Sequence, residues 1–382
     1  MPRGTVLITG GAGIVGRYAT DFLARSSLVK KVVIADIKKK EGETVKYNAQ
    51  IGSATMWNYP KVIFEKVDLT DIDAVVSLLK KHNPDVILQV ATMLSSYFYA
   101  HLAEKVIKDR GLPYEGHLAG HTIAKDFVFT YYVMQALKEA NINARVVNLA
   151  FPDITNYILG KIKLEPTIGA GTTDLTATGI QLLVAEALGV PIHNIDIRLV
   201  AHHAIRVIDP KKVPYYLKIM YNSEDITSQF DTIELFRKCI QITNYGIIIE
   251  NSSMTASSAV SNVLALLHDN GIIKHSPGPG GLPGGWPVRI NYDHISIMLP
   301  KEISVEKAIE INLKGMKYDG IDRVESDGTV VFTKDSVDYM KDVLKIDWPT
   351  VKPDEALDMA KDLIKAYKQL AEEINYKGIF GG

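Results

Sequence analysis

The stretch from Val6 to Asp36 constrains the fold of this chain more than any other. It reads VLITGGAGIVGRYATDFLARSSLVKKVVIAD: a strand-like start, glycines at 10, 13 and 16, a helix-like middle and a second apolar run ending in an acid. Glycines at this spacing let the turn bend tightly and let the backbone approach a pyrophosphate, while the next helix points its N-terminus at the phosphates. The combination predicts a dinucleotide site.

Asp36 indicates which dinucleotide is expected. It ends the second strand twenty residues after Gly16, where a carboxylate can accept hydrogen bonds from both ribose hydroxyls and repels a 2′-phosphate. NAD is therefore favoured over NADP, although Lys38 and Lys39 oppose this preference. Residues after the third strand are expected beside the adenine, and residues ending the fourth beside the nicotinamide. The predicted cofactor contacts are Gly10, Gly11, Gly13, Ile14, Val15, Gly16, Asp36, Ile37, Asp68, Leu69, Ala91 and Thr92.

The first 150 residues alternate short apolar runs with amphipathic stretches. Strands are expected at residues 6–9, 32–36, 62–69, 85–91 and 145–150, with helices between them. Fully apolar strands that alternate with helices predict an α/β fold, a doubly wound parallel sheet of the Rossmann type covered on both faces. We expect an NAD-binding domain over 1–150, a mixed α/β substrate domain over 151–348 and a C-terminal helical extension over 349–382.

The second half has a different pattern. A long helix is expected at 174–188, a strand at 194–204, a small-residue helix at 252–269 and an amphipathic helix at 352–376. The Gly- and Pro-rich run from Ser276 to Val288 predicts a loop that leads into a hairpin.

Composition excludes several classes of protein and partner. The net charge of −1 offers no basic stripe for nucleic acid and no polybasic membrane patch. With Cys239 as the one cysteine, a disulfide framework is excluded, which favours the cytoplasm. No signal peptide and no apolar run of membrane-spanning length are evident. No metal site is expected either: His117 and His121 have the spacing of a metal pair on a helix, but no acidic third ligand is evident.

Three stretches of the second half resemble the lactate/malate dehydrogenase family. They are NLAFPDITNYILGK, PTIGAGTTDLTATGIQLLVAEALGVPIHNIDIRLVAHHA and GGWPVRINYDHISIMLP, in the order and near the spacing of that family. The resemblance places His203 at the position of the catalytic histidine, which takes the alcohol proton while hydride passes to the nicotinamide. A neutral imidazole suits that task near neutral pH.

The departures from that family lie in the substrate pocket. Leu175 stands where the family has the aspartate that orients the histidine, and Thr178 stands where it has the arginine that clamps the substrate carboxylate. Asp174 is one position away from the first and is a candidate substitute, although one step around a helix turns a side chain by about 100°. Phe151 replaces the asparagine of an Asn-Pro pair. A small 2-hydroxy acid is therefore not the expected substrate.

The first half also resembles the extended short-chain dehydrogenases and sugar-nucleotide epimerases, through TGGAGIVG, VDLTD and PDVILQVA. That family uses a Tyr-x-x-x-Lys pair, and Tyr157 and Lys161 have this spacing. The lysine would lower the tyrosine pKa so that the tyrosine can act as a base.

Three functions follow from these patterns. The first is an NAD-dependent oxidoreductase with an altered pocket that moves hydride between nicotinamide and a secondary alcohol or carbonyl compound, using His203. The second is a sugar-nucleotide epimerase, dehydratase or reductase that uses Tyr157 and Lys161. The third is a non-catalytic NAD-binding sensor or structural protein. A homo-oligomer acting on a small-molecule substrate is expected.

Overall fold

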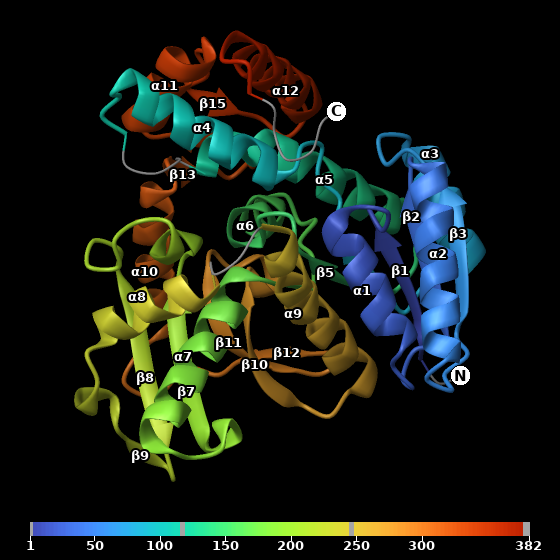
Figure 1. Ribbon diagram of the computed structural model, residues 1–382, viewed down its shortest axis with the longest axis horizontal. Coiled ribbons are helices and arrows are strands. Elements are labelled where there is room, and N and C mark those ends of the chain that lie inside the picture. The colour runs from blue at the N-terminus through green and yellow to red at the C-terminus, as the bar shows by residue number, and fades with distance from the viewer. Residues whose placement is uncertain (1–2, 115–118, 244–247, 377–382) are drawn as a thin grey trace.

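The computed structural model describes residues 3–114, 119–243 and 248–376. It contains a six-stranded parallel sheet, a six-stranded antiparallel sheet beside it and a three-stranded sheet near the C-terminus (Figure 1). No helix of the described part is long and apolar enough to cross a membrane.

The parallel sheet has six strands in the order β3-β2-β1-β4-β5-β6, and every neighbouring pair is parallel. In that order the strands are Lys61–Lys66, Lys31–Asp36, Thr5–Thr9, Val86–Gln89, Arg145–Asn148 and Ile168–Gly169. The order reverses between β1 and β4, which creates a crevice at the carboxyl ends of the strands. The predicted doubly wound sheet is confirmed.

Helices cover both faces of this sheet because its central strands are apolar on both sides. Val6 and Ile8 of β1 pack toward one face, in a core shared with α1 (Ile14–Ala24) and α9 (Ile248–His268). Leu7 packs toward the other face, in a core with α3 (Ile72–His82) and α5 (Ile123–Ala140). The helices that follow the strands are α1, α2 (Lys39–Ala54), α3, α5 and α6 (Pro152–Lys161).

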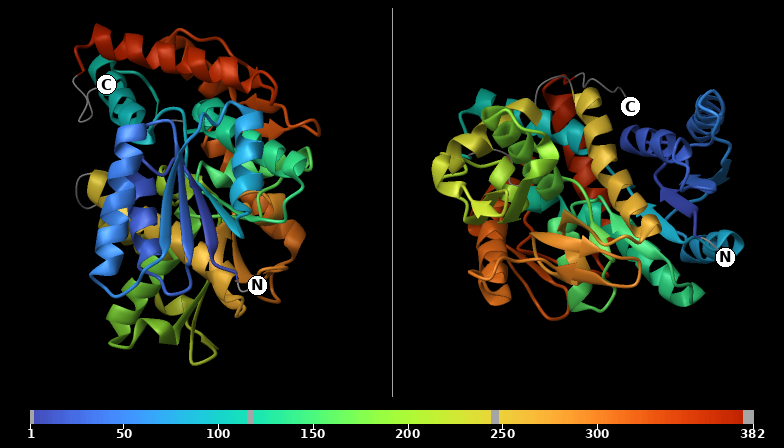
Figure 2. Two further views of the ribbon diagram at one scale, coloured as in Figure 1. Left: turned by 90° about the vertical axis from the view of Figure 1, so that its right-hand side faces the viewer. Right: turned by 90° about the horizontal axis from the view of Figure 1, so that it is seen from below.

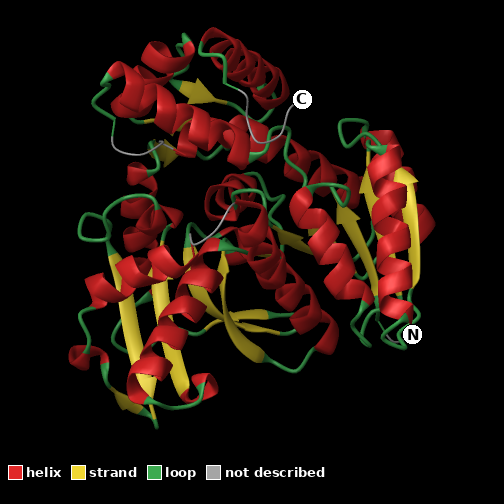
Figure 3. Ribbon diagram, in the orientation of Figure 1, coloured by secondary structure: helices red, strands yellow, loops and turns green. Residues whose placement is uncertain are grey.

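The second sheet is antiparallel and has the order β10-β11-β7-β8-β9, with β12 paired to β11. Figure 3 shows its strands in yellow, with helices in red packed around them. Its strands, in chain order, are Ile195–Ala201, Tyr215–Tyr221, Glu224–Asp225, Ile272–Pro277, Gly285–Ile290 and Ile295–Ile297. The helices packed around it are α7 (Thr172–Leu188), α8 (Thr232–Thr243), α9 (Ile248–His268) and α10 (Val305–Tyr318). Helix α9 also packs against α1, which joins the two sheets.

The Gly- and Pro-rich run is not the continuous loop that composition predicted. Strand β10 continues to Pro277 and β11 begins at Gly285, so only residues 278–284 form the turn between them. Proline lacks the N–H donor, but its carbonyl still accepts: Met298 N donates to Pro287 O at 2.9 Å. The buried side chain of Trp286 anchors this strand in the core.

The C-terminal elements build a further core together with the earlier helices α4 (Ser96–Arg110), α5 and α6. The small sheet β13-β14-β15 comprises Ile321–Val324, Val330–Phe332 and Thr350–Val351, followed by α12 (Ala356–Glu373). Between its strands lie α11 (Lys334–Tyr339) and the turn η6 (Met340–Leu344). Helix α12 lies across one end of the molecule, over α5 and α4 (Figure 2). The predicted C-terminal helix is thus confirmed.

Candidate functional site

The glycine turn between β1 and α1 is built as tightly as its sequence predicts. Gly10 has φ +75°, and a Cβ there would lie 2.7 Å from Ala91 Cα. A Cβ on Gly16 would lie 2.3 Å from Gly10 O, so α1 begins against the turn. Gly13 caps α1 and is exposed. The turn therefore offers the open N-terminus of α1, where a phosphate is favoured.

Asp36 lies beside this turn at the end of β2. Its Oδ2 accepts a hydrogen bond from Ala12 N at 3.0 Å, and its Oδ1 accepts one from Lys38 N at 3.0 Å. Each carboxylate oxygen can accept a further bond, so the side chain can still bind ribose hydroxyls. Ile37 next to it is exposed, as a surface for adenine would be.

The other predicted contacts lie after β3 and β4. Asp68 Oδ1 accepts bonds from the backbone and hydroxyl of Thr70, which holds it in a local turn, while Leu69 is buried. Ala91 is buried against Gly10, and Thr92 Oγ1 donates to Asp126 Oδ1 at 2.8 Å. Ala91 and Thr92 therefore lie at the crevice between β1 and β4, whereas Asp68 and Leu69 follow β3 at the edge of the same sheet. The glycines, Asp36 and this crevice together fit the phosphates and ribose of a dinucleotide.

Beneath Thr92 lies a buried ion pair that the sequence analysis did not identify. Lys125 Nζ is 2.5 Å from Asp126 Oδ1 and 4.9 Å from the centroid of the Tyr99 ring. The Lys125 side chain is 1% exposed. Burial lowers its pKa, although the neighbouring carboxylate opposes this effect. A charged pair inside the apolar stretch IAKDFVF was the one available signal.

His203 lies where β7 ends and the 3-10 turn η3 (His203–Arg206) begins. Its Nδ1 is 3.0 Å from Oδ2 and 3.1 Å from Oδ1 of Asp319, at the end of α10. A carboxylate only accepts, so Nδ1 is the donor and Nε2 is left as the reactive nitrogen. The His203 side chain is 21% exposed, whereas that of Asp319 is fully buried.

Two further side chains complete this buried centre. His202 Nδ1 lies 3.0 Å from Asp319 Oδ2, so one carboxylate oxygen serves both imidazoles. Asp153 of α6 accepts a bond from His203 N through Oδ1 at 3.1 Å. Asp153 Oδ2 and His202 Nε2 are buried and have no hydrogen-bond partner among the described residues. Neither Asp319 nor Asp153 was predicted, since no local spacing relates them to His203.

The charges around His203 raise its pKa although the residue is largely buried. Burial disfavours the imidazolium, but the Asp319 carboxylate outweighs burial, with Asp153 adding to it, so the pKa of His203 is raised. Burial likewise opposes ionisation of Asp319, yet the imidazoles of His203 and His202 hold its pKa well below the usual range. Burial raises the pKa of Asp153.

Phe151 covers His203 from the side of the parallel sheet. The two ring centroids are 5.0 Å apart and the rings meet edge to face. Phe151 has φ +45°, a left-handed conformation that costs a bulky residue about 1 kcal/mol or more. The residue therefore gives His203 an apolar neighbour at the position where the resemblance would place an asparagine.

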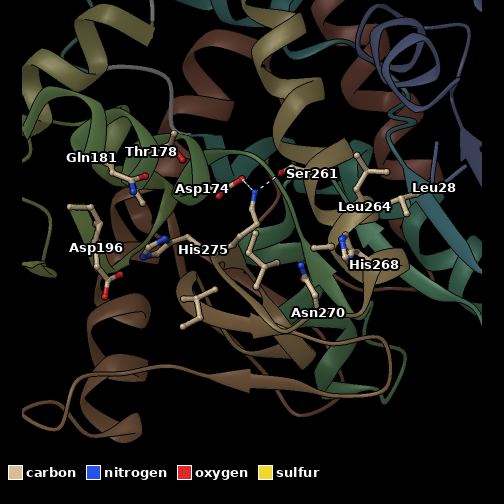
Figure 4. A pocket seen from close by; sticks show the side chains of 16 residues that line it. Leu28, Asp174, Thr178, Gln181, Asp196, Ser261, Leu264, His268, Asn270 and His275 are labelled. Carbon is tan, nitrogen blue, oxygen red and sulfur yellow. Dashed lines mark hydrogen bonds and ion pairs between the residues drawn. The ribbon is translucent and has the colours of Figure 1, made fainter. Parts of the chain in front are cut away.

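Asp174 is held by other partners than His203. Its Oδ2 accepts from Ser258 Oγ at 2.8 Å and lies 3.0 Å from Lys274 Nζ. Asp174 and Lys274 line a cavity of about 510 Å³ between α7, α9, β7 and β10, and Thr178 lines it too (Figure 4). The carboxylate that contacts His203 is that of Asp319.

Tyr157 and Lys161 are neighbours on α6. Lys161 Nζ lies 4.6 Å from the centroid of the Tyr157 ring. Tyr157 is half-buried and packs against the core that contains α12, while Lys161 is exposed. The spacing thus brings the amine over the ring, as expected for two residues one helical turn apart.

The described residues contain no group of three or more His, Cys, Asp or Glu side chains that could hold a metal ion. Of the two spaced histidines, His117 lies outside the described residues. His121 is buried, and its Nε2 lies 2.5 Å from the hydroxyl of Tyr367.

Comparison with known proteins agrees with this architecture. Residues 6–109 match the model of the NAD dependent epimerase/dehydratase family, whereas no curated protein sequence matches the chain. A lactate dehydrogenase from a Medee basin deep-sea metagenome library has a similar structure, with TM-score 0.58, 13% identity, and coverage of 84% of this chain and 98% of its own.

Malate dehydrogenases have similar structures as well. The enzyme from Picrophilus torridus, in its apo form, gives TM-score 0.58 at 15% identity, covering 83% of this chain and 96% of its own. The enzyme from Plasmodium falciparum, in complex with NADH, gives 0.57 at 11%, with coverage of 83% and 96%. The similarity to lactate and malate dehydrogenases predicted from the motifs is thus confirmed for the fold.

Proposed function

We propose that this protein is an NAD-dependent oxidoreductase that moves hydride between the nicotinamide and a secondary alcohol or carbonyl substrate, with His203 as the acid/base. One observation carries the proposal. His203, backed by Asp319, contacts Phe151 and Asp153, which follow the carboxyl end of β5. The glycine turn lies at the carboxyl edge of the same parallel sheet, so one crevice can serve both.

The cofactor proposal rests on the fit of the turn and of Asp36. The backbone from Gly10 to Gly16 would hold the pyrophosphate, and Asp36 would bind the adenosine ribose and disfavour a 2′-phosphate. When bound, NAD supplies the acceptor or donor of hydride. The family model that matches residues 6–109 and the NADH complex of the Plasmodium enzyme support this assignment.

The acid/base role follows from the hydrogen bonds of His203. Asp319 accepts from Nδ1 and so leaves the lone pair of the neutral ring on Nε2, where it can take the proton of an alcohol. In the reverse direction the imidazolium returns that proton to the carbonyl oxygen. The half-open position of His203 beside the Phe151 ring lets substrate reach Nε2 while water is partly excluded.

The first experiment measures cofactor binding by thermal unfolding with NAD, NADH or NADP. Ligand at a hundred times its dissociation constant stabilises by about 2.7 kcal/mol, so NAD and NADH should raise the melting temperature by roughly 2–4 °C. NADP should have little effect in the wild type. Failure of all three at millimolar concentration would contradict the cofactor assignment.

The second experiment follows NADH formation or consumption over a panel of secondary alcohols and ketones. His203→Gln should lower kcat on any active substrate by roughly 10²- to 10⁴-fold while the NAD-induced shift persists. His268→Gln is the matched control, because this exposed histidine lies in the cavity beside Asp174. NAD binding without turnover of any compound would instead favour the non-catalytic sensor.

The contact of Lys161 with Tyr157 supports a second candidate function, which can also be tested. A sugar-nucleotide epimerase, dehydratase or reductase would bind a UDP- or TDP-sugar and use Tyr157 as its base. Tyr157→Phe would then abolish turnover and His203→Ala would be tolerated, the reverse of the result expected for the first proposal. A homo-oligomer in the cytoplasm remains part of the proposal.

A further inference from the structure

Arg206 lies three residues beyond His203, is partly buried and has no anionic partner among the described residues. Its Nη2 donates to Thr243 Oγ1 of α8 at 2.7 Å. Its Nη1 is buried and has no hydrogen-bond partner among the described residues. In the described part of the chain no carboxylate lies within ion-pair distance of it. A guanidinium stays charged in a protein, so this site holds one uncompensated positive charge.

The backbone directs Arg206 toward the same side as His203. The two residues are the first and last of the 3-10 turn η3. Such a turn has three residues per turn, so side chains at i and i+3 lie one above the other. The positive charge of Arg206 also acts to lower the pKa of His203, against the larger effect of Asp319. Both groups therefore face one region.

Thr243 holds the guanidinium in a fixed orientation. Its hydroxyl donates to Cys239 O at 2.7 Å within α8 and accepts from Arg206. The same bond leaves Nη1 as the donor that still lacks an acceptor. A buried donor without an acceptor is destabilising, and a buried charge without a counter-charge more so. Burial also lowers the pKa of Arg206, as expected for a cation with no carboxylate beside it.

We infer that Arg206 binds an anionic group of the substrate, a carboxylate or a phosphate, and holds the substrate with its alcohol or carbonyl carbon at His203. The inference rests on the proposed function. It also explains how the protein can lack an arginine on α7: the position expected for one is Thr178, which lines the cavity beside Asp174. The anion is instead bound from the turn that carries the acid/base. Arginine suits this role because its planar donors match carboxylate and phosphate oxygens.

The test measures anion binding directly, with oxalate and inorganic phosphate as separate probes. Calorimetry is done on the full chain with and without saturating NADH, so that the result does not depend on turnover or on the cofactor. We expect at least one probe to bind the wild type. Arg206→Gln should weaken that binding roughly 10- to 100-fold, and Arg206→Lys should weaken it less, because a lysine keeps the charge but not the planar pair of donors. The stronger probe identifies the class of anion.

Two variants control for indirect effects. Arg237→Gln removes an exposed arginine of α8 that pairs with Asp209, and it should leave anion binding unchanged. Thr243→Val keeps the charge of Arg206 but removes the hydroxyl that orients the guanidinium. It should therefore weaken anion binding by a smaller factor than Arg206→Gln. This variant tests the inference if Arg206→Gln does not fold.

Any one of three results would overturn the inference. Neither anion binds the wild type, Arg206→Gln binds the anion as tightly as the wild type, or Arg237→Gln weakens anion binding as much as Arg206→Gln does. Failure of NADH to shift the melting temperature, with anion binding still dependent on Arg206, would contradict the cofactor and leave the anion site standing. NADH binding without any Arg206-dependent anion binding would contradict the anion site and leave the cofactor assignment standing.

Discussion

The Oδ2 atom of Asp319 lies 3.0 Å from Nδ1 of His203, although 116 residues separate the two in the chain. Asp319 ends α10, and Gly120 N donates to its carbonyl oxygen at 2.6 Å, so the aspartate is held from both its backbone and its side chain. This contact sets the tautomer of His203. It supplies the orienting carboxylate that the sequence resemblance would have placed at Leu175 of α7.

Replacing Asp319 should impair both chemistry and folding. In Asp319→Asn the neutral amide no longer stabilises the imidazolium, so kcat should fall by roughly 10²- to 10⁴-fold. The free energy of unfolding should fall by about 3–5 kcal/mol, because buried imidazoles lose their charged partner. Steady-state kinetics and urea unfolding check these values. Asp322→Asn removes a partly exposed carboxylate on β13 and should cost under about 1 kcal/mol. Equal effects of the two variants would argue against the role of Asp319.

The pH dependence of stability follows from the two opposite pKa shifts. The raised pKa of His203 contributes stability that is present below its unfolded value of about 6.5 and is lost as pH rises through the folded value. The lowered pKa of Asp319 contributes stability that is present above its unfolded value of about 3.9 and is lost as pH falls through the folded one. Both contributions are present between roughly pH 4 and 6.5. Urea unfolding from about pH 4 to well above about 6.5 should show a loss of stability on the alkaline side in the wild type and not in His203→Gln.

The same shift should be visible in activity. Alcohol oxidation needs neutral His203, so kcat/KM for oxidation should rise with pH around an inflection above about 6.5, while carbonyl reduction should fall. In Asp319→Asn the inflection should move to lower pH. An inflection that stays in place in this variant would assign it to another group.

Two glycines of the turn should respond differently to alanine. A Cβ at Gly16 would meet Gly10 O at 2.3 Å, so Gly16→Ala should lower the free energy of unfolding by about 1–3 kcal/mol. At Gly13 the nearest atom is Gly10 O at 3.2 Å and φ is −70°, so Gly13→Ala should cost under about 1 kcal/mol. Gly13→Ala should nevertheless weaken NAD binding at least about tenfold, because its methyl group faces the phosphates. Thermal unfolding with and without NAD separates the two effects, and unchanged NAD affinity would place the phosphates elsewhere.

The buried pair of Lys125 and Asp126 should be costly to break on one side only. Lys125→Met leaves the carboxylate of Asp126 with only neutral partners such as Thr92, and should lower the free energy of unfolding by about 3–5 kcal/mol. The double variant Lys125→Met with Asp126→Leu should recover much of that loss, because no charge is then buried alone. Urea unfolding of the single and double variants measures the coupling. Additive losses would show that the pair does not act as a unit.

Much of the fold could be predicted from sequence because its signals are local. The apolar runs around Val6 and Val32 specify strands that are buried on both faces, and the glycines specify the turn between the first strand and α1. The prediction for the Gly- and Pro-rich run was wrong because composition is also a local signal. It indicates the turn at residues 278–284 correctly. It does not reveal that Trp286 is buried in the core and that the residues around it form strand β11.

Within the candidate site, the sequence by itself determined the features that depend on residues close together in the chain. These are the glycines of the turn, Asp36 at the end of its strand and His203 at the end of β7. Only the tertiary structure decided which partners these groups have. Asp319 reaches His203 because α10 packs against β7, and Asp174 contacts Lys274 instead. The Arg206 guanidinium has no counter-charge among the residues that the structure describes. Spacing rules hold within one helix or strand, whereas such contacts depend on how whole elements pack, which no local pattern of residues encodes.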